Sequence, residues 1–418
     1  MIRRDFLLFL MITLGALVSG ISQESGGQIL QGYLLEAAEN NPGLNAKFKD
    51  YMAAMEKVPQ AGGLPDPQFA FGYFIQPVET RLGPQRATFG LSQTFPWFGS
   101  LGARKDAASE LALSKYALFE NAKSNLFFEV KTAFYQYYFM NKAIAITREN
   151  MEILRIFRNL SLVKIEAGSA TVVDELRVEL ELNDLENQLA YFLDSKEVLQ
   201  TRFNNLLQRD PEAGIALPEE LEPQVLPYPD QVVLDSIYAN NRELQAMDHR
   251  VNAFVKEEIV ASKDGLPKFS LGVNYFVIGE NSGSSMADNG KDAIMFPSVG
   301  LSIPIYRKKY KARIQEVAYL QEAEVERIEE KKTALHTLFR ETYRDFEDSG
   351  RRMSLNERQA EIAKKVLDIL ITSYSTNSED FEEVLRIERQ LLGYGLAREK
   401  AVIDRNVSVA FINYLLGN

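Results

Sequence analysis

The chain repeats one pattern of residues at an interval of about 200 positions, and this duplication constrains the fold more than any other feature. Matching segments include Asn40-Asn41 and Asn240-Asn241, Gly90-Leu91-Ser92 and Gly300-Leu301-Ser302, and Leu176-Arg177 and Leu385-Arg386. The three pairs are separated by 200, 210 and 209 residues. Because nearly constant shifts extend through most of the chain, we expect two copies of one structural plan.

The first residues have the pattern of a secretory signal peptide. Arg3 and Arg4 precede an apolar run, Phe6 to Val18, that is too short to span a bilayer comfortably. Small residues then lead to a cleavage site that we place after Ser22. The alternative is an uncleaved N-terminal membrane anchor. We therefore expect a signal peptide at residues 1–22 and a mature chain that leaves the cytoplasm.

The rest of the chain is expected to consist of two repeats and a linker. The first repeat covers residues 28–208 and the second covers 230–418, each with a helix, two strands, a long helix and a return helix. The linker at 209–229 contains Pro211, Pro218, Pro223, Pro227 and Pro229. These prolines exclude a helix or a central strand there. The strands are expected at about 68–77, 86–96, 268–278 and 294–306.

Each repeat contains a very long helical stretch. The first runs from Leu101 to Glu166 without a proline. Hydrophobic residues recur in it at spacings of three and four, which is typical of coiled coils. At a rise of about 1.5 Å per residue the stretch is about 100 Å long. The helices at Ile29–Val58 and Val172–Leu207 add up to a similar length, so we expect them to stack end to end, antiparallel to the long helix.

Four segments alternate hydrophobic residues with small or polar ones. Each is about 10 residues long, as a tilted transmembrane strand requires. A hydrophobic face opposite Gly, Ser, Thr and Asn suits a wall between lipid and a wet lumen. The residues expected to face lipid include Phe89, Leu91, Leu271, Val273, Leu301 and Ile303. The aromatic residues expected at the membrane interface are Phe95, Trp97, Phe98 and Tyr306. The alternative is a pair of half-buried hairpins in a soluble sheet.

Four strands cannot close a barrel. An open sheet in lipid leaves unpaired backbone groups at two edges, each costing several kcal/mol. We therefore expect a homotrimer whose strands complete a 12-stranded β-barrel, joined to an α-helical tunnel of long antiparallel coiled-coil helices. The expected fold class is mainly α with membrane β, internally duplicated.

The composition excludes several classes of function. The chain has no Cys and two His, which rules out disulfides and Cys/His metal sites. With 47 Lys+Arg and 58 Asp+Glu the net charge is −11, so a nucleic-acid partner is not expected. The carboxylates have the spacing of solvated helix faces. We expect no catalytic residues, no cofactor and no metal site, and thus no enzyme.

This plan resembles the TolC family of outer-membrane efflux and secretion channels. The best local match is Ala167 to Leu176, which is similar to the family's Gly-Thr-x-Thr-x-x-Asp-x-Leu pattern at a helix restart. The segment Phe95-Pro96-Trp97-Phe98-Gly99 is similar to a strand end in metal-efflux members. The chain departs from some relatives because it has no Cys for an N-terminal lipid. Its second turn, Thr376 to Asp380, also lacks the glycine.

The resemblance implies a location and a function. It implies a trimer in the cell outer membrane with a large periplasmic part, whose tapered end meets a periplasmic adaptor and an inner-membrane pump of the RND or ABC type. We expect the exit duct of a tripartite efflux pump, a passive conduit for small molecules or ions. The alternatives are the channel of a type I protein secretion system or, in a different class, a periplasmic coiled-coil adaptor or scaffold.

The turns between the long and return helices are expected to form the narrow end. Gly168 and Asn377 should end the long helices, and Ser169 and Ser378 could cap the next ones. The acidic residues expected to form a cation-attracting constriction are Asp174, Glu383, Glu379 and Asp380. The alternative is that these carboxylates only stabilise helix N-termini. Arg177 and Arg386 are candidates for ion pairs that keep the helices closed.

Overall fold

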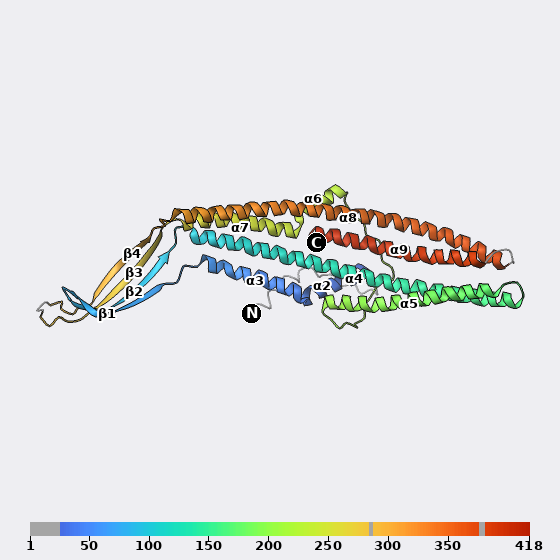
Figure 1. The fold of residues 1–418 in the computed structure, drawn as a ribbon, viewed down its shortest axis with the longest axis horizontal. Coiled ribbons are helices and arrows are strands. Elements are labelled where there is room, and N and C mark those ends of the chain that lie inside the picture. The colour runs from blue at the N-terminus through green and yellow to red at the C-terminus, as the bar shows by residue number, and fades with distance from the viewer. Residues whose placement is uncertain (1–25, 284–286, 376–380) are drawn as a thin grey trace, which may run out of the picture.

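The computed structural model describes residues 26–283, 287–375 and 381–418 of an elongated molecule. A four-stranded sheet lies at one end, and long helices extend from it to the other end (Figure 1). We call the end away from the sheet the tip. The expected signal peptide lies outside the described residues, as do Asn377, Ser378, Glu379 and Asp380.

Both halves of the chain have the same order of elements. The first half contains α2 (Gly26–Asn40), α3 (Pro42–Gly62), β1 (Gln68–Thr80), β2 (Gly83–Phe95), α4 (Ser100–Glu166) and α5 (Val172–Leu207). The second contains α6 (Asp230–Asn240), α7 (Arg242–Asp264), β3 (Lys268–Ile278), β4 (Ala293–Ser302), α8 (Arg307–Ser375) and α9 (Phe381–Leu415).

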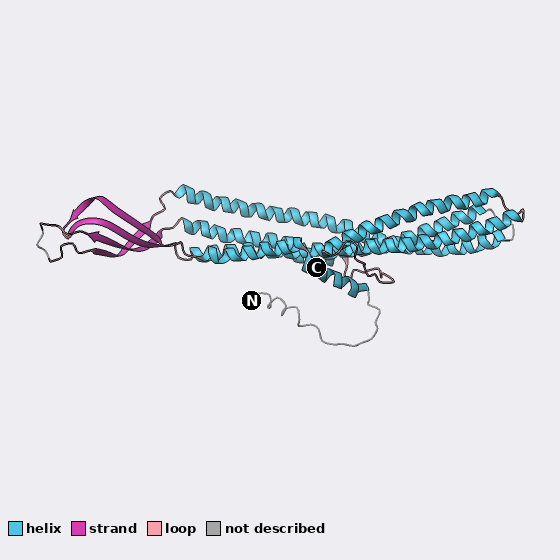
Figure 2. Cartoon of the chain, turned by 90° about the horizontal axis from the view of Figure 1, so that it is seen from below, coloured by secondary structure: helices cyan, strands magenta, loops and turns pink. Residues whose placement is uncertain are grey.

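Two helices, α4 and α8, run almost the whole length of the helical part, with 67 and 69 residues. The shorter helices α3 and α5 both pack along α4, and α7 and α9 both pack along α8. Helix α4 also contacts α7 and α9, so the two halves lie side by side. Figure 2 shows the same arrangement from below, with the strands confined to one end.

The sequence predicted one continuous helix before each pair of strands, and this is wrong in detail. Each helix is interrupted at an asparagine. Asn41 has an extended backbone (φ −67°, ψ 117°) and precedes Pro42, whose ring disfavours a helical conformation at the residue before it. Asn241 has a similar backbone without a following proline (φ −59°, ψ 121°). Its side chain instead accepts hydrogen bonds from the backbone N–H groups of Glu243 and Leu244.

The two asparagines also connect distant parts of the chain. The side-chain amide of Asn41 donates to Leu206 O at 3.3 Å, and that of Asn241 donates to Leu415 O at 3.0 Å. These carbonyl groups lie in the last turns of α5 and α9. Each helix break is therefore fastened to the end of the return helix of its own half, partway along the long helix.

The core of the tip half is shared by both halves of the chain. One buried cluster contains side chains of α4, α5, α8 and α9, including Phe157, Val178, Leu367 and Phe381. Because hydrophobic burial is contributed by all four helices, the two helical hairpins are packed together near their ends.

The sheet is antiparallel with the strand order β1-β2-β3-β4. Its boundaries differ from those expected at two places. β1 and β2 extend to Thr80 and Gly83, where a longer polar loop was expected. β4 ends at Ser302, so Ile303 lies beyond the strand and not within it. Pro304 follows Ile303 and has no N–H group to continue a ladder.

Candidate functional site

One face of the sheet is hydrophobic and exposed. The register pairs Leu91 with Val273 and Phe269 with Leu301, which places these side chains on the same face. Among the residues expected to face lipid, Phe89, Leu91, Leu271, Leu301 and Ile303 are exposed, Leu301 to 54%, and Val273 is half-buried. No element of the described chain covers these large apolar side chains. The face is therefore suited to an apolar environment.

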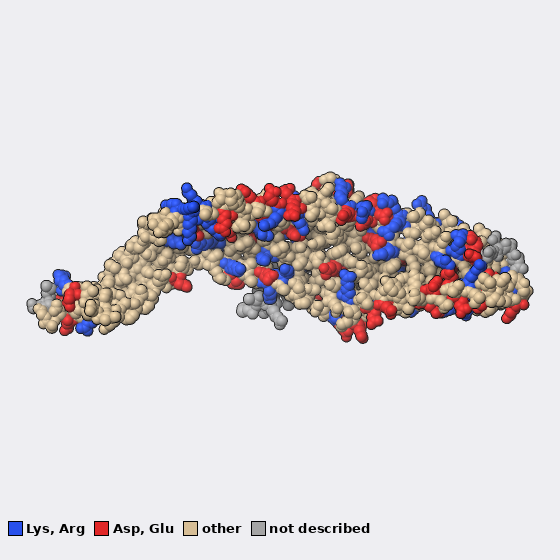
Figure 3. Space-filling view, in the orientation of Figure 1, with Lys and Arg blue, Asp and Glu red and all other residues tan. Residues whose placement is uncertain are grey.

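The opposite face carries small and polar residues. At Gly272 a Cβ atom would lie 2.8 Å from the carbonyl oxygen of Leu91, so a larger residue would displace the neighbouring backbone. Figure 3 shows that Lys, Arg, Asp and Glu gather at the two ends of the sheet and leave its middle uncharged. An uncharged band of this kind is expected where a sheet meets hydrocarbon.

Aromatic residues gather where the sheet meets the helices. The Trp97 ring stacks on Phe269 with ring centroids 5.6 Å apart, and Phe98 lies 6.3 Å from the same ring. Phe95 and Phe98 are exposed, and Tyr306 is 77% exposed. All four aromatic residues expected at a membrane interface therefore lie at or just beyond strand ends at this boundary.

At the tip, the first turn is built by Gly168 and Thr171. Gly168 has φ +67°, in the left-handed region that glycine adopts without strain. Ser169 was expected to cap the next helix, but its hydroxyl donates back to Lys164 O at 3.1 Å. The residue that precedes α5 is Thr171, whose N–H and hydroxyl both donate to Asp174 Oδ2, at 3.1 and 3.2 Å. The capping role belongs to Thr171, two residues later than expected.

Asp174 and Arg177 lie together, and Arg177 reaches the second half of the chain. An Arg177 guanidinium nitrogen lies 3.8 Å from Asp174 Oδ1 and another lies 2.8 Å from Glu382 Oε2. Glu382 was not among the residues predicted to form the constriction. Arg177 therefore neutralises a carboxylate on its own helix, α5, and one on α9.

Glu383 and Arg386 pair within α9. Arg386 Nε donates to Glu383 Oε2 at 2.9 Å, and a second contact joins the same two groups. This hydrogen bonding lowers the pKa of the exposed Glu383 carboxyl group. Within one chain this pair does not connect the two hairpins.

Two further contacts between the halves were missed from the sequence. Arg389 of α9 forms an ion pair with Glu181 of α5. Lys164 of α4 is 9% exposed, donates to the backbone oxygen of Tyr374 of α8, and lies 3.9 Å from the centre of its ring. Burial, and next the charge of Asp174, raise the pKa of the Tyr374 hydroxyl. Glu181 and Arg389 are 208 residues apart, and Lys164 and Tyr374 are 210 residues apart. Both separations are close to the interval of the duplication, and this interval is the sequence signal that could have identified the two contacts.

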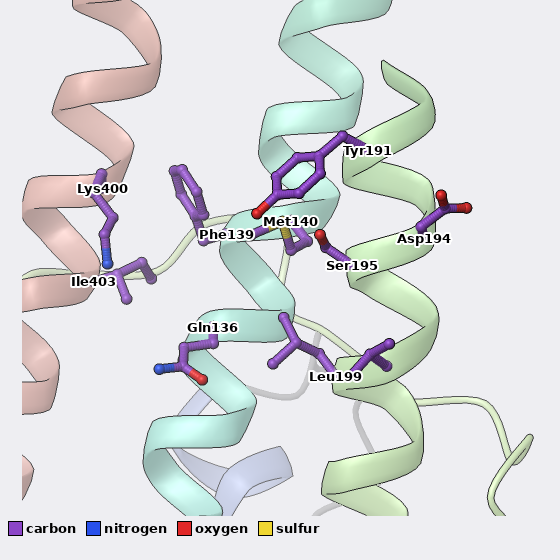
Figure 4. A pocket seen from close by; sticks show the side chains of 10 residues that line it. Gln136, Phe139, Met140, Tyr191, Asp194, Ser195, Leu199, Lys400 and Ile403 are labelled. Carbon is purple, nitrogen blue, oxygen red and sulfur yellow. The ribbon is translucent and has the colours of Figure 1, made fainter. Parts of the chain in front are cut away.

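A groove between α4, α5 and α9 lies away from the tip. Its volume is about 480 Å³, and its walls include Phe139, Met140, Val198, Leu199 and Ile403. Figure 4 shows Tyr191, Ser195 and Lys400 at its margin. The lining is mainly hydrophobic and carries no arrangement of groups for acid–base or nucleophilic chemistry.

The described residues contain neither a membrane-spanning helix nor a cluster of metal-binding side chains. Among the helices at 26–283, 287–375 and 381–418, none combines the length and hydrophobicity that a membrane-spanning helix needs. In the same ranges, no group of three or more His, Cys, Asp or Glu residues is placed to bind a metal ion.

Residues 34–207, most of the first half, match the family described as outer membrane efflux protein. This match points to the outer membrane efflux protein family for the first half of the chain. This confirms the resemblance inferred from the sequence. No curated protein matches the chain.

Solved structures of low identity share the fold of this chain over nearly its whole length. CusC is 15% identical with a TM-score of 0.77, covering 97% of this chain and 96% of CusC. VceC from Vibrio cholerae is 14% identical with a TM-score of 0.76, covering 93% and 96%. MtrE from Neisseria gonorrhoeae, solved in an open state, is 16% identical with a TM-score of 0.75, covering 96% and 94%.

The fold of this chain is shared with solved outer-membrane channels such as MtrE, and residues 34–207 match the outer membrane efflux protein family. The mainly helical fold with a small sheet, expected from the sequence, is confirmed.

Proposed function

We propose that three copies of this chain form the exit duct of a tripartite pump. The observation that carries the proposal is a sheet with an uncharged middle and two open edges, β1 and β4, attached to helices about 100 Å long. Unpaired edges are costly in lipid, and three sheets joined edge to edge give 12 strands and remove every edge. The duct continues through the periplasm as a helical tunnel.

The proposed partners follow from this arrangement. The helical tip lies at the far end from the sheet and would meet a periplasmic adaptor and an inner-membrane pump of the RND or ABC type. The duct itself performs no chemistry and conducts small molecules or ions passively. The proposed trimer is tested by measuring the oligomeric state. A native mass measurement in detergent should give the mass of three chains. A stable, folded monomer would contradict the closed barrel.

We propose further that the tip forms a cation-attracting constriction. Asp174 and Glu383 are the first candidates, followed by Glu379 and Asp380. Three-fold symmetry would repeat each carboxylate around the axis, and like charges in a confined lumen attract cations. Arg177 lies 3.8 Å from Asp174 and Arg386 donates to Glu383, so each arginine partly neutralises the acid beside it.

Single-channel recording tests the constriction. Asp174→Asn together with Glu383→Gln removes two charges per chain and keeps similar side-chain shapes. The double variant should show weaker cation selectivity and weaker block by multivalent cations. Glu152→Gln, at an exposed site on α4 away from the turns, is the matched control and should behave as wild type. Wild-type selectivity in the double variant would place the constriction elsewhere.

A further inference from the structure

Five cations lie within seven residues at the start of α8. They are Arg307, Lys308, Lys309, Lys311 and Arg313, and we call them the basic collar. No acidic residue follows them until Glu316. Figure 3 shows Lys and Arg side chains gathered over this part of the molecule, directly beside the uncharged sheet. The net charge of the whole chain is −11, so the collar is opposite in sign to the chain as a whole.

The stability of α8 does not account for these cations. The first turn of α8 contains no acidic residue, and positive charges near a helix N-terminus oppose the helix dipole. The helix dipole therefore does not explain these cations, and their location supports binding of an external negative charge.

Within the described ranges, only the two arginines of the basic collar have partners for their side chains. Arg307 donates to Gly265 O at 3.0 Å, and Arg313 pairs with Glu316 at 2.8 Å and lies 3.9 Å from Glu257. Lys308, Lys309 and Lys311 are exposed, and their ammonium groups form no ion pair with any described residue. Three lysine charges are thus available to a partner outside the chain.

The collar lies at the level of the interfacial aromatic residues. It begins immediately after Tyr306. Just beyond the end of β2, Trp97 stacks on Phe269 of β3, and Phe269 pairs with Leu301 of β4. Lys263 of α7 adds a further cation there, because its ammonium group donates to Phe98 O at 3.0 Å. Aromatic rings mark the headgroup region of a bilayer, where lipid phosphates also lie.

We propose that Lys308, Lys309 and Lys311 bind the phosphate groups of anionic phospholipids in the membrane leaflet that faces the helices. The inference rests on the proposed insertion of the sheet in a bilayer. Charge complementarity and continuity with the uncharged band favour lipid over an acidic protein. Long lysine side chains can also lie along the membrane boundary while their ammonium groups reach the headgroups.

Trp97 provides a native probe of this contact, because the chain has one tryptophan. The full protein is placed in phosphatidylcholine nanodiscs that contain a minor fraction of either brominated phosphatidylglycerol or brominated phosphatidylcholine. We expect the anionic lipid to quench Trp97 fluorescence about twofold more than the zwitterionic lipid, because it is enriched at the collar. Lys308→Gln with Lys309→Gln should remove this excess.

Two control variants make the result specific. Lys364→Gln with Lys365→Gln changes another exposed lysine pair on the same helix, far from the sheet, and should keep the excess. Lys308→Arg with Lys309→Arg preserves the charge and should also keep it. The proposal that the basic collar binds anionic lipid would be overturned by equal quenching from both lipids in the wild-type protein, or by loss of the excess in the Lys364–Lys365 variant. Either result would leave the proposed membrane insertion unaffected. Absence of quenching by either lipid would overturn the insertion as well.

Discussion

Arg177 of α5 and Glu382 of α9 form an ion pair of 2.8 Å that joins the two helical hairpins at the tip. A second pair, between Glu181 and Arg389, joins the same two helices about one turn further from the tip. Lys164 and Tyr374 connect α4 to α8 at the same end. These polar contacts link the two hairpins and would break if the hairpins separated. The hydrophobic cluster beside them is shared by all four helices.

Removing both arginines of these pairs should favour an open tip. Each exposed ion pair contributes about 1 kcal/mol or less, so Arg177→Ala with Arg389→Ala should increase conductance in single-channel recordings without unfolding the protein. Arg155→Ala is the control, since Arg155 pairs with Glu152 on its own helix. Unchanged conductance in the double variant would mean that other contacts keep the tip closed.

Arginine substitutions on the two faces of β4 should have unequal effects. Val299 is exposed on the hydrophobic face and pairs with Leu271, whereas the adjacent Ser298 points to the opposite face and pairs with Gly272. Val299→Arg should oppose insertion by about 2–4 kcal/mol if the residue lies near the bilayer midplane, and Ser298→Arg should oppose it less. Folding into vesicles, followed by gel mobility, measures the difference. Equal losses would show that the assigned lipid-facing side is wrong.

Glu388 should make stability depend on pH. Its side chain is 1% exposed, and neither carboxylate oxygen has a hydrogen-bond partner among the described residues, although Asn150 lies nearby on α4. Burial raises the pKa of the Glu388 carboxyl group above its usual value of 4.5; the nearby Asn150 amide opposes this increase, and the charge of Glu149 adds to it. The folded state therefore favours the protonated form, so the free energy of unfolding falls as pH rises from about 4.5 to the raised pKa.

Glu388→Gln should abolish this dependence. The variant should unfold at a higher temperature than wild type at neutral pH, and at a similar temperature below pH 4.5, where Glu388 is protonated in both states. Glu179→Gln is the control, because Glu179 occupies the equivalent exposed position in the first half of the chain. A higher unfolding temperature at every pH would indicate a packing effect and not a titration.

Loss of the Asn241 side chain should destabilise the joint between α7 and α9. Asn241 is 3% exposed, accepts two backbone hydrogen bonds and donates one to Leu415. Asn241→Ala should lower the free energy of unfolding by about 0.5–2 kcal/mol for the lost cap, with a further cost for the unpaired Leu415 carbonyl group. Asn240→Ala, at an exposed site within α6, should have a much smaller effect in denaturant unfolding.

Much of the fold could be predicted because it depends on periodic patterns. The alternation in Phe269 to Val277 identifies a strand, and the spacing from Leu126 to Leu154 identifies a coiled-coil helix. The break at Asn41 was missed, although Asn-Pro is a local signal for it. The break at Asn241 was harder to predict, because no proline follows it and it is stabilised by side-chain hydrogen bonds to Glu243, Leu244 and Leu415.

The tip was predicted less completely than the fold. Asp174 and Arg177 were identified because they follow a recognisable turn. Arg389 and Glu181 were missed because an ion pair between helices depends on which faces meet, and one sequence does not specify this. The capping residue was misplaced because Ser169 and Thr171 are chemically equivalent as caps, and only the backbone path after Gly168 distinguishes them.

The nearly equal lengths of α4 and α8, 67 and 69 residues, restrict how this protein can change in size during evolution. An insertion in one long helix alone would make one hairpin end protrude beyond the other and would rotate every later side chain by about 100° per added residue. A longer duct therefore requires insertions of whole coiled-coil repeats in both halves, each matched in the return helix beside it. The length of the helical part can change only in coordinated steps, although single substitutions remain free to alter its surface.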